Sequence, residues 1–257
     1  MITINNLTKK IDNNLILNNI NLKIETGETK VIIGRSGVGK SVLLKHIVGI
    51  MKPDSGNIVI NDKDITLLPE KELNKVRMEI GLVFQGGALF DSMNVEENVA
   101  FVLNEFMKLS RKVVKEKVAD ALAMVGLQGI EKMMPSQLSG GMRKRVSLAR
   151  VLCMEPEIIL YDEPTTGVDP ITADAINNLI VELHDKLKVT SIVVTHDMSS
   201  AYKVADSIAM LYHGQVIAEG TPEDIRQTTH PVVRQFIDGA AQGPITDGDH
   251  LIFGHVR

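Results

Sequence analysis

The chain reads Gly34-Arg35-Ser36-Gly37-Val38-Gly39-Lys40-Ser41 between an apolar run at 30–33 and a helix-like stretch at 42–48. A phosphate-binding loop requires this order of strand, glycine-rich loop and helix. The glycines let consecutive backbone N–H groups turn toward a polyphosphate, and the N-terminus of the helix adds a positive field. We therefore predict that Lys40 reaches the β- and γ-phosphates of a nucleotide and that the Ser41 hydroxyl ligates Mg²⁺. The alternative is a turn followed by an ordinary helix cap.

Short apolar runs rich in Ile and Val recur along the chain, at 30–33, 58–60, 80–84, 158–161, 191–194, 208–212 and 215–218. Several are continuous, which is typical of strands covered on both faces in a mostly parallel sheet with crossover helices. Between about 96 and 152 no strong strand run is found, and the stretch 111–126 carries apolar residues at helical spacing. The pattern predicts an α/β fold with a helical insertion.

The composition excludes several classes of protein. The 257 residues are 44% hydrophobic and 23% charged, so the chain can form one large domain or two small ones and is not mainly disordered. A net charge of −4 gives no basic excess that would favour nucleic acid as a partner. The single cysteine, Cys153, predicts a reducing compartment. We find no secretory signal pattern and no apolar run near the roughly 18 residues of a spanning helix, so we expect any membrane role to be peripheral.

A second candidate site follows the run at 158–161, where Asp162 and Glu163 are adjacent. Neighbouring carboxylates at the end of a buried strand are costly unless a cation or a reacting water lies there. We predict that Asp162 belongs to the Mg²⁺ shell and that Glu163 orients and activates the attacking water. The alternative is a surface turn, since Pro164 comes next.

A third element, Leu138-Ser139-Gly140-Gly141-Met142, precedes a basic helix-like run at 143–151. Ser139 is a good helix N-cap and the glycines expose backbone donors, so this is a second potential anion site at a helix start. Together these elements resemble the ATP-binding cassette (ABC) ATPases, whose signature usually reads Leu-Ser-Gly-Gly-Gln. Met142 replaces the final glutamine and removes a side-chain amide.

The resemblance implies a P-loop NTPase fold with a mixed-sheet, RecA-like core and a helical signature subdomain. It also implies roles for three further residues: Gln85 as the lid-loop glutamine that senses Mg²⁺ and water, Asp169 in the loop that crosses to a partner subunit, and His196 as the switch histidine near the γ-phosphate. Catalysis is then expected from Lys40, Gln85, Glu163 and His196. Mg²⁺ is expected at Ser41, Gln85 and Asp162. ATP is expected to contact Gly34, Arg35, Ser36, Gly37, Val38, Gly39, Lys40, Ser41, Ile11, Ser139, Gly140, Gly141 and Asp169.

Ile11 marks a departure from the family pattern. An aromatic residue usually stacks on adenine shortly after the first strand, whereas Lys9-Lys10-Ile11-Asp12 offers only an aliphatic side chain. Apolar contact can still support a base, but without the preference of a π-face. We therefore predict weak discrimination between ATP and GTP.

The resemblance also implies a head-to-tail dimer, in which the Ser139–Gly141 element of one copy caps the nucleotide held by the glycine-rich loop of the other. Two ATP molecules hold such a dimer closed and hydrolysis opens it. The implied division is an ABC ATPase domain at 1–220, with a helical subdomain at about 90–152, and a C-terminal extension at 221–257 for contacts with the dimer partner and a regulator. The alternative for this extension is a flexible end.

Three stretches, at 85–95, 140–150 and 232–244, resemble the phospholipid-transport ATPases of the Mla (maintenance of lipid asymmetry) type. This implies a peripheral protein on the cytoplasmic face of the inner membrane, which drives phospholipid movement between the inner and outer membranes. The implied partners are a second copy of the chain, a permease dimer, an MCE-type lipid-binding subunit and a STAS-domain regulatory subunit, with no nucleic acid.

Other functions remain as alternatives. The chain could be an ABC ATPase for another cargo or a soluble cassette without a transport role. A P-loop GTPase would need an Asn-Lys-x-Asp base reader, and the nearest phrase, Asn61-Asp62-Lys63-Asp64, is out of order. A DNA-repair ATPase of the superfamily would carry long heptads, and a translation cassette protein would usually carry two cassettes.

Overall fold

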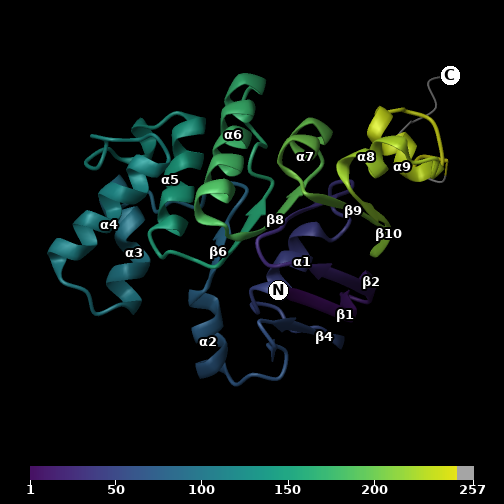
Figure 1. Cartoon of the computed structure of the whole chain (residues 1–257), viewed down its shortest axis with the longest axis horizontal. Coiled ribbons are helices and arrows are strands. Elements are labelled where there is room, and N and C mark those ends of the chain that lie inside the picture. The colour runs from purple at the N-terminus through teal and green to yellow at the C-terminus, as the bar shows by residue number, and fades with distance from the viewer. Residues whose placement is uncertain (248–257) are drawn as a thin grey trace.

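The computed structural model describes residues 1–247, and two sheets form its centre (Figure 1). The larger sheet has the order β10 (Gln215–Gly220), β9 (Ser207–Tyr212), β3 (Thr29–Ile33), β8 (Thr190–Thr195), β7 (Ile158–Asp162) and β6 (Ile80–Val83). Its neighbours pair in parallel except for β10, which is antiparallel to β9. The smaller, antiparallel sheet has the order β2 (Asn14–Ile24), β1 (Ile2–Ile11), β4 (Ser55–Ile60) and β5 (Lys63–Asp64). The predicted α/β fold with a mixed sheet is confirmed.

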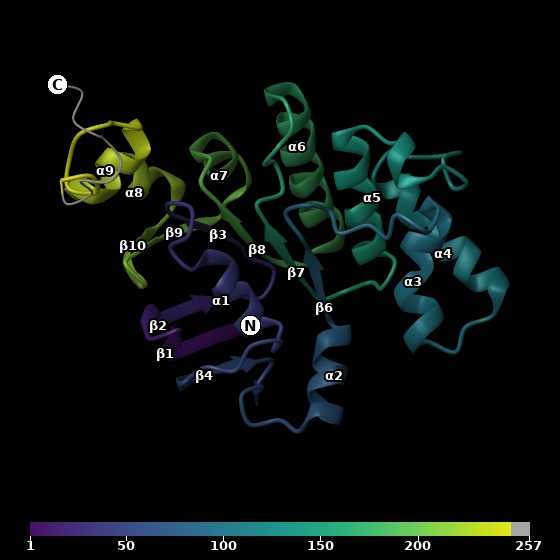
Figure 2. The same ribbon diagram turned by 180° about the vertical axis from the view of Figure 1, so that it is seen from behind.

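The helices cover these sheets and extend beyond them at both ends of the molecule (Figure 1). Their bounds are α1 (Lys40–Ile47), α2 (Glu70–Met78), α3 (Val95–Phe106), α4 (Arg111–Met124), the 3-10 helix η1 (Pro135–Gln137), α5 (Gly140–Leu152), α6 (Pro170–Leu187), α7 (Met198–Val204), α8 (Pro222–Gln227) and α9 (Pro231–Asp238). Figure 2 shows α3, α4 and α5 at one end of the molecule and α8 and α9 at the other. Within residues 1–247, no helix combines the length and apolar character that crossing a membrane requires.

The continuous apolar runs are explained by burial on both faces of the larger sheet. Ile32 and Val194 pack on one face with Leu43 and Leu44 of α1 and with the smaller sheet. On the opposite face, alternate residues of the same strands pack in a second cluster with helices α5, α6 and α7. A strand between two such layers needs no polar face, because neither side of it meets water.

One predicted strand lies in a different sheet. The run at 58–60 was expected in the mostly parallel sheet, but it belongs to β4 and pairs antiparallel with β1. Ile58 and Ile60 are buried while Val59 between them is partly exposed, the alternation of a sheet with one wet face. Strands β1, β2 and β5 were not among the expected runs. Asn6 and Asn19, at φ 49° and 54°, lie at irregularities in the pairing of β1 and β2 that break the period-two pattern.

The predicted helical insertion contains α3, α4, η1 and α5. Helix α4 covers most of the stretch 111–126; Ser110 caps its start, and Gly126, at φ 68°, follows its end. Whether this region acts as a subdomain over about 90–152 stays a prediction.

The described part of the C-terminal extension is folded, contrary to the alternative of a flexible end. Ile225, Val233 and Ile245 are buried in the main core, and the Gln235 side chain bonds Ile245 N at 2.7 Å and Thr246 Oγ1 at 3.1 Å. Its last part, 248–257, lies outside the described residues.

Candidate functional site

The parallel strands β3, β8, β7 and β6 are neighbours, so the segments that follow their carboxyl ends meet at one edge of the sheet. A cavity of about 390 Å³ lies there. It is lined by residues of the glycine-rich loop and α1, by residues that follow β6, β7 and β8, and by the β1–β2 hairpin: Ser36, Gly37, Gly39, Lys40, Ser41, Val42, Gln85, Glu163, His196, Ile11, Asp12, Asn14 and Ile16. The fold therefore brings together candidate residues that are up to 185 positions apart, from Ile11 to His196.

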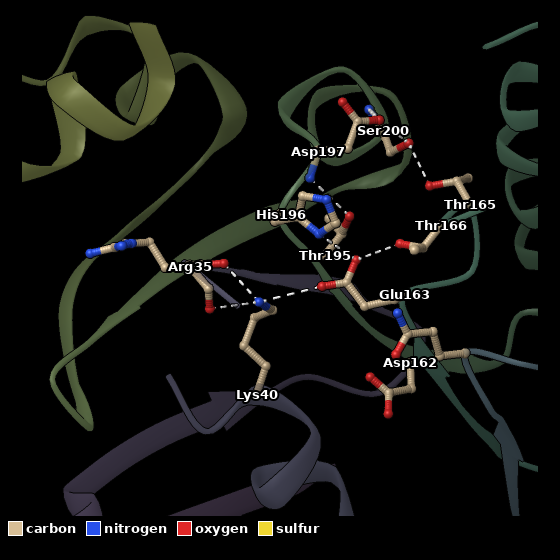
Figure 3. A network of polar contacts seen from close by, with 12 residues as sticks. Arg35, Lys40, Asp162, Glu163, Thr165, Thr166, Thr195, His196, Asp197 and Ser200 are labelled. Carbon is tan, nitrogen blue, oxygen red and sulfur yellow. Dashed lines mark hydrogen bonds and ion pairs between the residues drawn. The ribbon is translucent and has the colours of Figure 1, made fainter. Parts of the chain in front are cut away.

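The Lys40 side chain points between the backbone at Arg35 and the Glu163 carboxylate (Figure 3). Its Nζ donates to Gly34 O at 2.7 Å and to Arg35 O at 3.0 Å, and the residue is only 5% exposed. Gly34 has φ 153°, and a Cβ there would lie 2.4 Å from Leu211 O, so only glycine fits. Burial lowers the pKa of Lys40, while the Glu163 carboxylate opposes that shift.

Ser41 and Asp162, two of the predicted metal ligands, are in direct contact, since Ser41 Oγ donates to Asp162 Oδ1 at 2.8 Å. Burial raises the pKa of Asp162, and the nearby Glu163 charge raises it further, whereas the Ser41 hydrogen bond opposes both. Mg²⁺ prefers such oxygen donors together with phosphate oxygens and water. Among the described residues there is no group of three His, Cys, Asp or Glu side chains that could hold a metal ion, so a cation here would also need nucleotide oxygens.

Glu163 connects the glycine-rich loop to His196. Its Oε1 lies 3.4 Å from Lys40 Nζ, while its Oε2 accepts from Thr166 Oγ1 at 3.1 Å and lies 2.9 Å from His196 Nδ1. The residue is 7% exposed and has φ 49°, which an L-residue adopts only at a cost of about 1–3 kcal/mol. This arrangement gives a fixed carboxylate that can accept a proton from a water in the cavity.

The second predicted anion site is not part of this cavity. Ser139 Oγ accepts from Met142 N at 3.2 Å as the N-cap of α5, and Gly140 and Gly141 begin that helix. Asp169 caps α6 instead, accepting from the backbone N–H groups of Ile171 and Thr172 at 3.0 Å. Within one copy, these four candidates therefore lie apart from the residues around Lys40.

Sequence reasoning missed several residues at this site. Ile16 lines the cavity with Ile11, Thr166 bonds Glu163, and Lys144 Nζ donates to Gln85 O and lies 3.5 Å from Glu163 O. Thr166 could have been found from its place three residues after Glu163. Nothing in the local sequence signals Lys144, because the contact with Gln85 spans 59 positions.

Comparison with known proteins gives a consistent picture. A family model described as "ABC transporter" matches residues 17–166. The intermembrane phospholipid transport system ATP-binding protein MlaF of Haemophilus influenzae is 41% identical, over 95% of this chain and 93% of its own length. The probable ribonucleotide transport ATP-binding protein mkl of Mycobacterium tuberculosis is also 41% identical, over 95% of this chain and 68% of its own length.

Among solved structures, one neighbour is a dimer of the ATP-binding cassette MJ0796 in a post-hydrolysis state, bound to ADP and Pi. It is 34% identical, with a TM-score of 0.79, and the match covers 86% of this chain and 99% of that one.

Proposed function

Because this chain belongs to the ABC transporter family and is an ATP-hydrolysing cassette, we propose that it is the motor subunit of a transporter that moves phospholipids between the inner and outer membranes. The cargo rests on one observation, the 41% identity with the phospholipid-transport protein of Haemophilus influenzae over 93% of that protein's length. A protein named for ribonucleotide transport is also 41% identical, but the match covers only 68% of that protein's length. Transport of another cargo is therefore the second candidate function.

We propose that the loop from Gly34 to Ser41 holds the phosphates of ATP and that Lys40 neutralises their charge. In this structure Lys40 bonds two loop carbonyls and pairs with Glu163. Phosphate oxygens are stronger partners for an ammonium than carbonyls. ATP would therefore draw Lys40 away and leave the Glu163 carboxylate free to accept a proton from water, with His196 and Thr166 orienting it.

The residues around Ser41 and Asp162 fit Mg²⁺. When bound, the ion would offset negative charge on the β- and γ-phosphates. Ser41 and Asp162 would hold it, together with Gln85, which lines the same cavity as Ser41. Ile11 and Ile16 would support the nucleotide base by apolar contact, since they line the same cavity from the β1–β2 hairpin.

Two copies of the chain form a dimer, as the related cassettes do. We propose that this dimer is head to tail. Ser139, Gly140 and Gly141 lie outside the cavity of their own copy and begin a helix whose backbone donors suit an anion. Facing the partner's Lys40 would give these donors a phosphate to bind. Asp169 would lie at the same interface, because the residues on both sides of it lie against the start of α5: a Cβ on Gly141 would meet Thr172 Cγ2 of α6 at 2.6 Å, and a Cβ on Gly140 would meet Val168 Cγ1 of the preceding loop at 3.6 Å.

For the assembly, we propose a permease dimer, an MCE-type lipid-binding subunit and a STAS-domain regulator, with this chain bound at the cytoplasmic face of the inner membrane. The proposed division is a cassette at 1–220, whose helical part at about 90–152 drives the permease, and an extension at 221–257 that contacts the neighbouring copy and the regulator. Packing of Val233 and Ile245 into the main core fixes the described part of that extension relative to the cassette.

The test is purification from membranes in detergent, with identification of the chains and lipids that copurify. We expect a permease, an MCE-type subunit and bound phospholipid, and ATPase activity that rises when phospholipid vesicles are added. The Glu163→Gln variant, purified in the same way, is the control for ATPase activity from contaminants. A complex without an MCE-type subunit would contradict the lipid assignment while leaving the ATPase function intact.

A further inference from the structure

Two cationic side chains of α5 bind the backbone that follows β6. Lys144 Nζ donates to Gln85 O, and the Arg150 guanidinium donates to Ala88 O at 2.7 Å and to Gly87 O at 3.0 Å. The segment that carries the proposed lid-loop glutamine is therefore attached to α5 at three of its four carbonyls along 85–88, those of Gln85, Gly87 and Ala88.

The next part of this segment is held by a different helix. Asn98 of α3 is fully buried; its Oδ1 accepts from Phe90 N at 2.8 Å and its amide donates to Met93 O at 2.8 Å. Because Asn98 holds the distal part of the loop independently, Lys144 and Arg150 are not needed to keep the whole segment folded. Their contacts determine where its first residues lie.

Lys144 also faces the acid pair. Its ammonium lies 3.5 Å from Glu163 O, and the Asp162 and Glu163 carboxylates act on its charge. Burial lowers the pKa of both Lys144 and Arg150, which shows that placing these cations here costs solvation energy. An apolar side chain could pack α5 without that cost. A cation at position 144, unlike an apolar residue, can donate to the carbonyls of Gln85 and Glu163. These two contacts fix the backbone of Gln85 relative to that of Glu163.

Helix α5 is a continuous helix of 13 residues, about 20 Å long, that begins at the Ser139 cap. We propose that Lys144 and Arg150 are positioning residues that make the placement of Gln85 depend on the position of α5. This rests on the proposed function, in which the start of α5 contacts the nucleotide of the partner copy. A shift of α5 on contact with the partner's nucleotide would then pass through Lys144 and Arg150 to the backbone at Gln85 and Glu163 of the same copy.

The first test is Lys144→Met, with Lys144→Arg as the conservative variant and Lys112→Met, an exposed position on α4, as the control. We expect Lys144→Met to lower kcat by about 10–100-fold, since a displacement of about 1 Å of a positioned group can cost that much. The Kd for a fluorescent ATP analogue should stay within about twofold. Lys144→Arg should recover most of the lost kcat. Wild-type turnover in Lys144→Met would overturn the proposal, as would a loss of nucleotide affinity that matches the loss of kcat.

A double-mutant cycle then tests the link to the signature. If Ser139 and Lys144 act in series, Ser139→Ala combined with Lys144→Met should lose about as much kcat as the worse single variant. Losses that multiply would show independent roles and overturn the coupling. Should Lys144→Met fail to fold, Arg150→Lys replaces it in the cycle, because lysine keeps the charge but cannot bond two carbonyls in a fixed fork. Failure of the wild type to hydrolyse ATP would instead refute the proposed function.

Discussion

Replacing Glu163 by glutamine removes one charge at the centre of the site and changes almost no volume. The carboxylate has two sides in this structure: Oε1 faces Lys40 Nζ at 3.4 Å, and Oε2 meets both Thr166 Oγ1 and His196 Nδ1. An amide can place its oxygen on only one side. If the amide oxygen faces Thr166 and His196, the NH₂ group points at the Lys40 ammonium. The ion pair is then lost, and two hydrogen-bond donors face each other in its place.

The cost to stability follows from the partners that Lys40 retains. It still donates to Gly34 O and Arg35 O, so the loss should be that of one charged hydrogen bond, about 1.5–3 kcal/mol, and not the full penalty of a stranded buried charge. For a chain of this length this corresponds to a Tm lower by about 3–12 °C. ATP supplies phosphate oxygens to Lys40, so the difference in Tm between variant and wild type should shrink when nucleotide is bound.

Hydrolysis should fall much further than stability. Loss of a general base costs about 10²–10⁴-fold in rate, or about 2.7–5.4 kcal/mol of transition-state stabilisation. We therefore expect Glu163→Gln to bind ATP, to accumulate as a closed dimer and to release phosphate slowly. Thermal unfolding with and without ATP, size-exclusion chromatography and phosphate release measure the three effects, with Glu182→Gln on the exposed face of α6 as the control. Phosphate release within about tenfold of the wild-type rate would refute this role for Glu163.

Three further predictions concern the cation, the signature and the base. Burial raises the pKa of Asp162 above its ordinary value of 3.8. As the pH falls, Asp162 should therefore be protonated, and cation binding lost, at a higher pH than for an exposed aspartate. The same protonation should increase the free energy of unfolding, because the native carboxyl binds the proton more tightly than the unfolded one. Isothermal titration with Mg²⁺ and ATP across acid pH tests this, and Asp162→Asn should abolish the pH dependence. Ser139→Ala should lower the free energy of unfolding by about 1 kcal/mol through the lost cap of α5, and should also prevent ATP-dependent dimerisation. The control, Ser110→Ala, removes the equivalent cap of α4 and should affect stability alone. Equal dimerisation of both variants would count against a role of Ser139 in the interface. The wild type should hydrolyse ATP and GTP with kcat/KM values within about tenfold of each other. Ile11→Phe should increase the affinity for both nucleotides by about 2–12-fold, as expected from about 0.5–1.5 kcal/mol of aromatic stacking. A strong preference of the wild type for ATP would contradict the first expectation.

Structural features formed by residues that are adjacent in the chain could be predicted from the sequence. The glycine-rich loop, the acid pair and the serine-capped helix are each built by neighbours along the chain, so their residue types report their local geometry directly. The predicted helical stretch became α4, and the apolar runs other than 58–60 became strands of the larger sheet. Most of these strands are apolar throughout because both faces of that sheet are covered. Strands β1 and β2 escaped prediction because their irregular pairing at Asn6 and Asn19 interrupts the alternation by which a strand is recognised.

By itself, the sequence determined which chemical groups are present and the class of fold that carries them. Only the tertiary structure decided which groups meet. The strand order β3-β8-β7-β6 places Glu163 between Lys40 and His196, and the packing of α5 brings Lys144 to Gln85 across 59 positions. Such contacts depend on how distant segments pack, and no local pattern encodes that arrangement, because each segment would have the same periodicity beside any other neighbour.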